Sequence, residues 1–108
     1  MAKKETQVID RLRDYLRRVN RKYPVNKAIL FGSYATGKTH GESDIDLAVF
    51  SKAVNDRNRL KIAADILRET SSYRLDIQPL VFSYKDYVTG ENDFIREQIK
   101  RKGIVVFG

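Results

Sequence analysis

The chain has 108 residues and a formal net charge of +7, which suits one small domain, residues 1–108, rather than a catalytic domain with a separate substrate domain. Cysteine is absent and histidine occurs once, which excludes disulfides and thiolate metal sites and argues against a histidine-based zinc site. No apolar run approaches the roughly 20 residues of a membrane span, and the basic N-terminal segment lacks the apolar core of a signal peptide. We therefore expect no membrane association and a cytoplasmic location.

The positive charge is concentrated near the N-terminus. Residues 1–27 hold nine Lys or Arg against three acidic residues, and the remainder is close to neutral. Such a basic end suggests an anionic partner, for example nucleic acid, a nucleotide or an acidic protein face. Charge alone favours a simpler interpretation, in which the cations form the solvated side of an amphipathic helix.

The first half of the chain predicts a helix followed by two strands. The helix covers about residues 5–23 and ends before Pro24, and its apolar face repeats at i, i+4, i+7, i+8 and i+11, with Val8, Leu12, Tyr15, Leu16 and Val19. A short apolar strand over residues 26–31 leads into a Gly32-Ser33 turn. The second strand is expected over residues 43–50.

The second half predicts two helices and two strands. Asn55 or Asp56 is expected to cap a helix that ends near residues 70–72, with a buried stripe of Leu60, Ala63, Ala64 and Leu67. A strand over residues 73–82 contains Pro79, which predicts a sheet edge or a strand end.

A turn near Gly90 precedes a helix over about residues 92–102, with Phe94, Ile95 and Ile99 inward and Gly103 at its end. Residues 104–107 form a last strand. This order predicts a small α/β (α+β) domain with helices packed on a sheet.

Two carboxylates in the second strand carry the strongest chemical signal. Side chains alternate along a strand, so Asp44 and Asp46 share one face while Ile45 and Leu47 point into a core. Two carboxylates so close repel each other unless a cation lies between them. A hard divalent ion with oxygen ligands is the natural occupant, Mg²⁺ above all.

The glycine-rich segment between these strands allows two interpretations. Residues 32–39, GSYATGKT, match the phosphate-loop pattern G-x-x-x-x-G-K-[ST]. In that motif Lys-Thr opens a long helix that aims backbone N–H groups at the phosphates. Only four residues separate Thr39 from the next apolar strand, and the aspartates precede their apolar run. The match is therefore taken as a coincidence.

The other interpretation uses Gly32-Ser33 and the SDIDL segment of residues 43–47 together. Gly-Ser after a strand, a polar turn, and Asp-x-Asp on a neighbouring strand resembles the nucleotidyltransferases of the polymerase-β-like superfamily. The short chain and the tail of residues 101–106 resemble its minimal nucleotidyltransferase (MNT) domains. The resemblance covers most of residues 22–107 and implies a polymerase-β-like fold with a mixed sheet.

The resemblance implies roles for individual residues. Asp44 and Asp46 would hold two Mg²⁺ ions, and Asp76, on another predicted strand, would complete the metal and catalytic set. Gly32 would let the backbone approach the triphosphate of ATP, and Ser33 would donate to its phosphate oxygens. Relatives often carry arginines just after Gly-Ser, where this chain has Tyr34, Ala35 and Thr36, so Lys38 is expected to supply the positive charge for the nucleotide.

MNT domains of this size resemble the antitoxin half of HEPN/MNT toxin–antitoxin pairs. The implied reaction is transfer of AMP from ATP to a hydroxyl, with a tyrosine of a cognate HEPN toxin as the expected acceptor, within a hetero-oligomer. Two alternatives stay open: an antitoxin that neutralises by binding alone, and a nucleotidyltransferase acting on a small molecule or an RNA end. Salt-sensitive RNA binding would favour the last, although no separate nucleic-acid-binding domain is expected.

Overall fold

The computed structural model describes residues 3–32, 35 and 44–108. A four-stranded mixed sheet forms its centre, with strand order β3-β2-β1-β4. β1 pairs antiparallel with both β2 and β4, whereas β2 and β3 run parallel. The elements in chain order are α1 (Lys3–Lys22), β1 (Lys27–Phe31), β2 (Ile45–Ser51), α3 (Arg59–Arg68), the 3₁₀ helix η1 (Glu69–Ser72), β3 (Ile77–Ser83), α4 (Tyr84–Thr89), the π-helix η2 (Ile95–Lys100) and β4 (Ile104–Phe107).

The pairing of β1 with β2 bears on the phosphate-loop pattern. A phosphate loop joins a strand to a long helix that packs on a parallel sheet. Here the strands on either side of the pattern are antiparallel neighbours, with Phe31 opposite Asp46. This geometry is that of a hairpin and not of a phosphate-loop unit.

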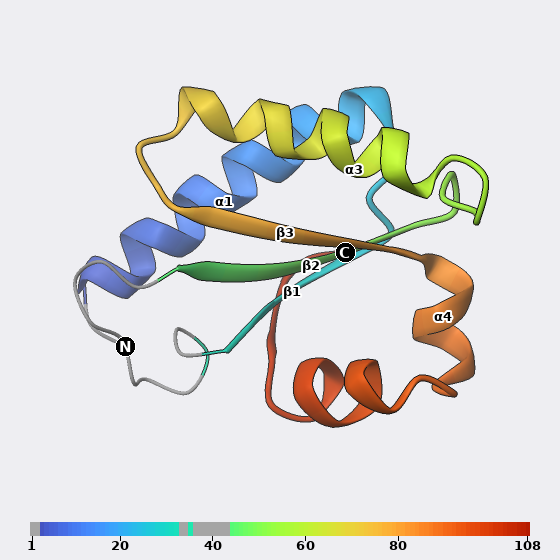
Figure 1. Ribbon diagram of the computed structural model, residues 1–108. Helices are drawn as coiled ribbons and strands as arrows, with labels where there is room; N and C mark the ends of the chain where they lie inside the picture. The colour runs from blue at the N-terminus through green and yellow to red at the C-terminus, as the bar shows by residue number, and fades with distance from the viewer. Residues whose placement is uncertain (1–2, 33–34, 36–43) are drawn as a thin grey trace.

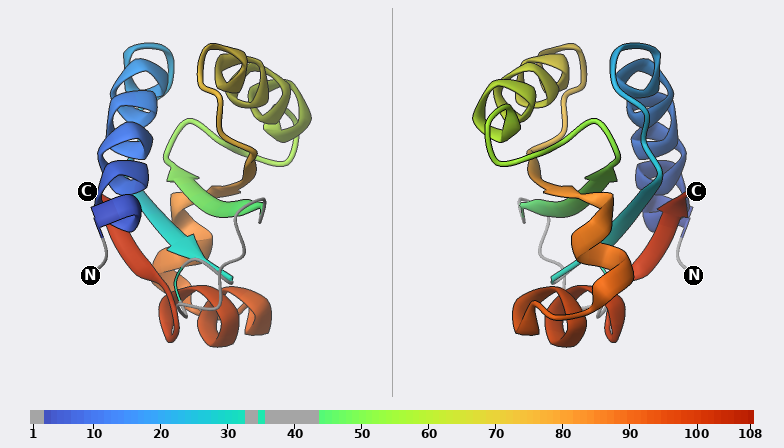
Figure 2. Two further views of the ribbon diagram at one scale, coloured as in Figure 1. Left: turned by 90° about the vertical axis from the view of Figure 1, so that its left-hand side faces the viewer. Right: turned by 90° about the vertical axis from the view of Figure 1, so that its right-hand side faces the viewer.

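One face of the sheet is covered by α1 and α3, as Figures 1 and 2 show. The apolar face predicted for the first helix is buried there, with Leu12, Tyr15 and Leu16 fully enclosed. They pack against inward-facing strand residues that include Leu30 and Leu47. Each buried leucine contributes about 1.5–3 kcal/mol to folding stability. This layer holds the larger cluster of buried side chains and forms the main core.

The opposite face is covered by α4 and η2, drawn in orange and red in Figure 1. Ile95 and Ile99 are fully buried against the sheet, as predicted, together with Ala48 and Phe50. Phe94 is different, because 44% of its surface is exposed.

The predicted buried stripe of α3 is wrong except for Ala63, which is half-buried and packs against the core. Ile62 and Ile66 face the core at 3% and 1% exposure, whereas Leu60 and Leu67 lie outside at 86% and 51%. Both faces of this helix are apolar, so periodicity alone could not choose between them. Packing against α1 determines which face of α3 is buried. Ile62 and Ile66 lie in the same core cluster as Tyr15, and the Tyr15 hydroxyl donates to the Ile66 carbonyl.

Several boundaries also differ from the predictions. Asn58 is the N-cap of α3, and Asn55 instead accepts from the backbone N–H groups of residues 57 and 58 in the preceding turn. α4 was not predicted; Ser83 caps it by accepting from the Asp86 N–H, and Gly90 ends it with φ +65°. Gly103 follows η2 without a positive φ, and its N–H donates to the Ile99 carbonyl.

β3 is an edge strand, as Pro79 predicted. The Asp76 carbonyl accepts from the Ile45 N–H on the β2 side. Backbone groups alternate along a strand, so those of Pro79 and Val81 point outward. Proline offers no N–H, and the Val81 carbonyl accepts from Arg59 Nε at 2.8 Å. Two outward groups of this edge are therefore unavailable, which disfavours pairing with another strand.

In the described ranges, no helix is long and apolar enough to cross a membrane.

Candidate functional site

Three segments meet at one end of the sheet. β1 ends there at Phe31, and β2 and β3 begin there at Ile45 and Ile77, which are paired in register. Gly32, Asp44, Asp46 and Asp76 all lie at these strand ends. The topology therefore brings together residues that are more than 40 positions apart in the sequence.

Asp44 and Asp76 lie side by side because each immediately precedes one of two parallel strands in register. Both side chains are exposed. A hydrogen bond with Asp76, reinforced by mutual repulsion, raises the pKa of Asp44 above its ordinary value. Crowded carboxylates of this kind share a proton when no cation offsets their charge.

Gln78 supports this pair and was not singled out from the sequence. Its amide Nε2 donates to Asp76 Oδ1 at 2.9 Å, and the backbone places Gln78 beside Asp46. The contact orients the carboxylate of Asp76, which also bonds with Asp44. The signal was available, since a residue two positions after Asp76 shares its strand face.

Asp46 lies on the same strand face as Asp44 and leans toward Gly32. Burial raises its pKa above the ordinary value, and the side chain is half-buried. A Cβ on Gly32 would lie 2.4 Å from Asp46 Oδ2, and Gly32 has φ +74°. The backbone conformation therefore favours glycine at this turn, and a Cβ there would displace the Asp46 carboxylate.

Ile45 and Leu47 point to the opposite face and are buried in the core, as the alternation predicted. The register thus places all three predicted carboxylates on one side of the sheet. Ser33 and Lys38, the other predicted nucleotide-binding residues, lie outside the described residues.

The donor set fits a hard divalent cation. Its three predicted members offer carboxylate oxygens only, which Mg²⁺ prefers, and the contact with the Asp76 carboxylate raises the pKa of Asp44. Among the described residues, no three acidic or histidine side chains are gathered tightly enough to hold a metal as they stand. Asp44 is turned to Asp76 and Asp46 to Gly32, so metal binding requires side-chain rotation.

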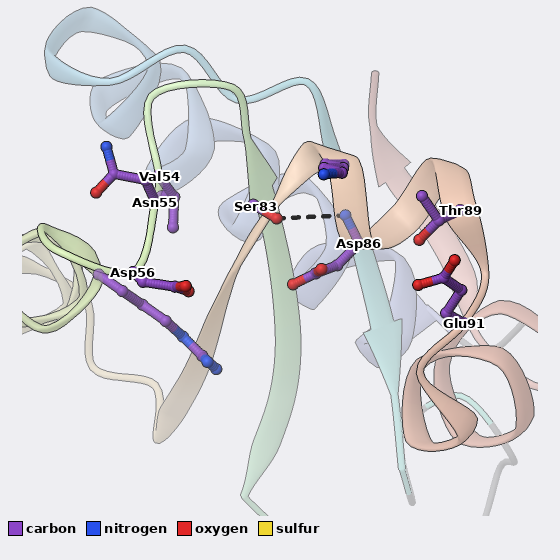
Figure 3. A pocket seen from close by; sticks show the side chains of 9 residues that line it. Val54, Asn55, Asp56, Ser83, Asp86, Thr89 and Glu91 are labelled. Carbon is purple, nitrogen blue, oxygen red and sulfur yellow. Dashed lines mark hydrogen bonds between the residues drawn. The ribbon is translucent and has the colours of Figure 1, made fainter.

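A separate polar cavity of about 440 Å³ lies at the other end of the sheet, beyond the ends of β2 and β3. Figure 3 shows Asp56, Asp86 and Glu91 among the residues around it, with Ser83 bonded to the Asp86 N–H. Ser83 helps cap α4 there. None of the three predicted carboxylates lines this cavity, and the chemistry that we predict belongs to the opposite end.

Comparison with known proteins identifies the family and the fold. The family model for "Polymerase beta, Nucleotidyltransferase" matches residues 13–108. No curated protein matches the chain in a sequence comparison.

Three solved structures share the fold. A candidate nucleotidyltransferase from Sulfolobus solfataricus superposes with a TM-score of 0.63 at 16% identity, covering 94% of this chain and 80% of the other. A toxin–antitoxin complex with AMP-PNP gives 0.58 at 21%, covering 89% and 73%. A double aspartate-to-glutamate mutant of the toxin–antitoxin MntA-HpeT gives 0.56 at 19%, with the same coverage.

Proposed function

Because this chain belongs to the polymerase β nucleotidyltransferase family, we propose that it transfers AMP from ATP to a hydroxyl of a partner protein. The proposed partner is a cognate HEPN toxin, the acceptor is a tyrosine, and the modification silences the toxin within a hetero-oligomer. Two of the structural neighbours are toxin–antitoxin complexes, and one of them contains the ATP analogue AMP-PNP. These neighbours support the proposals that the partner is a toxin and that the nucleotide is ATP.

One observation carries the proposal. The register between β2 and β3 places Asp44 beside Asp76 on the face that also holds Asp46. Three carboxylates at the strand ends, next to a glycine with a positive φ, suit a reaction that brings a triphosphate and a hydroxyl together.

In the proposed reaction, the acceptor oxygen attacks the α-phosphorus of ATP. The new O–P bond forms as the bond from the α-phosphorus to the bridging oxygen breaks, so pyrophosphate leaves with that electron pair. The acceptor proton passes to a carboxylate oxygen, and Asp76 is the proposed base because Gln78 holds its other oxygen.

Asp44, Asp46 and Asp76 would hold Mg²⁺, which offsets the charge on the attacking and leaving oxygens. Gly32 lets the backbone approach the phosphates, while Ser33 and Lys38 are proposed to contact them. The side chains of Asp44 and Asp46 must leave their present partners when the cation and nucleotide bind.

The proposal is tested with ATP labelled at the α-phosphate and the purified toxin. We expect Mg²⁺-dependent label on the toxin with the wild-type protein, and none with an Asp44→Ala, Asp46→Ala double variant. An Asp86→Ala, Glu91→Ala variant is the matched control, because it removes two carboxylates from the far end of the sheet. Label that persists without Asp44 and Asp46 refutes the mechanism.

The same variants separate catalysis from simple occlusion. If the double aspartate variant still protects cells from the toxin while it transfers no AMP, the protein neutralises by binding alone. Loss of both protection and transfer supports adenylylation.

A further inference from the structure

The outward side of α3 carries an apolar stripe without a partner in the described part of the chain. Leu60 and Leu67, seven positions apart, are 86% and 51% exposed. Ala64 lies exposed between them, and Ala63 is half-buried at the margin of the stripe. A helix with this spacing usually buries such a stripe against another element.

The stripe continues into a groove beside the edge strand. Leu60 and Ala63 from α3, with Pro79 and Leu80 from β3, are among the residues that line a space of about 390 Å³. Leu80 is 40% exposed. Asp56 and Arg59 also line this space. The groove therefore has apolar residues from each of two elements and one side chain of each charge.

The backbone of β3 limits what can occupy this groove. Pro79 has no N–H to offer, and Arg59 already donates to the outward carbonyl of Val81. A bound strand would find neither group available. Both features favour side-chain packing by a helix over addition of a strand, with anchors at i, i+3 or i+4, and i+7.

Charge beside the stripe favours a foreign partner over a second copy. Lys61 and Arg68 are both exposed, and at 100° per residue they follow Ala64 around the same side of α3. Arg68 also pairs with Asp65 at 3.2 Å, so these three side chains together carry a net charge of +1. An antiparallel pairing of two α3 helices about a twofold axis would place these cations next to their own counterparts. A partner helix with carboxylates on its flank meets opposite charges instead.

We propose that the stripe and groove bind an amphipathic helix with an apolar face and acidic flanks, supplied by the protein that accepts the nucleotide. This rests on the proposed function only in taking the docked protein to be the acceptor. β3 connects the groove to the predicted site, because Asp76 immediately precedes that strand. Docking here holds the acceptor next to the carboxylates.

The test is fluorescence anisotropy without ATP. The probe is a labelled helical peptide with leucines at i, i+4 and i+7 and glutamates on both flanks, and the control peptide carries lysines instead. We expect wild-type protein to bind the acidic peptide, and added salt to weaken the binding. A Leu60→Ser, Leu67→Ser variant should bind at least about tenfold more weakly.

Val88→Ser is the matched control variant, since Val88 is 63% exposed on α4, on the other face of the sheet. Circular dichroism checks that each variant is folded, and the exposed positions make unfolding unexpected. Equal peptide affinity in wild type and the double leucine variant overturns the proposal, as does absence of binding to wild type. Sedimentation tests for a dimer. If the wild-type protein is a dimer and the two leucine substitutions dissociate it, the groove binds a second copy, and the proposal is overturned.

An Asp44→Asn variant separates this proposal from the catalytic one. It should bind the acidic peptide as wild type does, because Asp44 lies outside the groove. If no AMP transfer is found but anisotropy follows the expected pattern, the docking surface stands and the proposed chemistry fails. If AMP transfer is found but the peptide does not bind as expected, only the proposed docking surface is rejected.

Discussion

Replacing Gly32 with alanine tests the geometry of the candidate site most directly. Gly32 has φ +74°, and an added Cβ would lie 2.4 Å from Asp46 Oδ2. The left-handed backbone costs an alanine about 1–2 kcal/mol. The second effect is local, because the Asp46 carboxylate must move away from the position where we expect it to bind a cation.

Gly90→Ala supplies a matched control for the backbone term. Gly90 has φ +65° and nothing within 4 Å of an added Cβ. We therefore expect both variants to lose about 1–2 kcal/mol of stability, which lowers the melting temperature by about 4–8 °C for each kcal/mol in a domain near this size. Thermal unfolding in EDTA measures this loss of stability without any contribution from a bound metal ion.

Ligand binding separates the two variants. Isothermal titration with Mg²⁺ and a non-hydrolysable ATP analogue should show at least about tenfold weaker binding for Gly32→Ala, which corresponds to about 1.4 kcal/mol. Gly90→Ala should bind as wild type does. If both variants bind the analogue equally well, the carboxylate of Asp46 beside Gly32 has no part in nucleotide binding, and our account of this turn is wrong.

Three further predictions concern single side chains. Asp44→Asn should raise the melting temperature in EDTA and abolish stabilisation by Mg²⁺. Asp76 raises the folded-state pKa of Asp44, so protonation of Asp44 stabilises the wild-type protein at about pH 4, and this stabilisation is lost toward pH 7. The gain in melting temperature over wild type should therefore grow across that range. Lys38→Ala should weaken ATP binding more than Mg²⁺ binding, and equal ATP affinity in calorimetry would reject its role. Tyr15→Phe should cost about 1–3 kcal/mol in urea unfolding, since the buried Ile66 carbonyl loses its donor; an unchanged midpoint would show that another group satisfies that carbonyl.

The two faces of β2 could be predicted from sequence, but the assembled site could not. Alternation alone places Asp44 and Asp46 opposite Ile45 and Leu47, and the structure has this arrangement. The position of Asp76 depends on which strand neighbours β2, in which direction and in which register. None of these is a local property of the residues near Asp76, so only the resemblance indicated that it belonged to the site.

α4 could have been found from its own residues. Ser83 and Asp86 form a Ser-x-x-Asp start, and Gly90 is a typical residue after a helix end. The preceding strand and the short length of six residues hid the pattern, because Tyr84 and Val88 also suit a strand. Its side chains Tyr84 and Tyr87 pack against the second core cluster, so the omission left one layer of the fold incomplete.

The error in α3 has a different cause and a functional meaning. Leu60, Ala63, Ala64 and Leu67 satisfy the spacing of a buried face better than Ile62 and Ile66 do, yet the isoleucines are buried. Periodicity predicts that a helix face is buried, but it does not predict whether the same chain or a partner protein buries it. In a chain of 108 residues one sheet face has room for α1 and only one side of α3. The stripe left outside lies next to an edge strand that disfavours strand addition, and this is why we propose it as the surface for a partner helix.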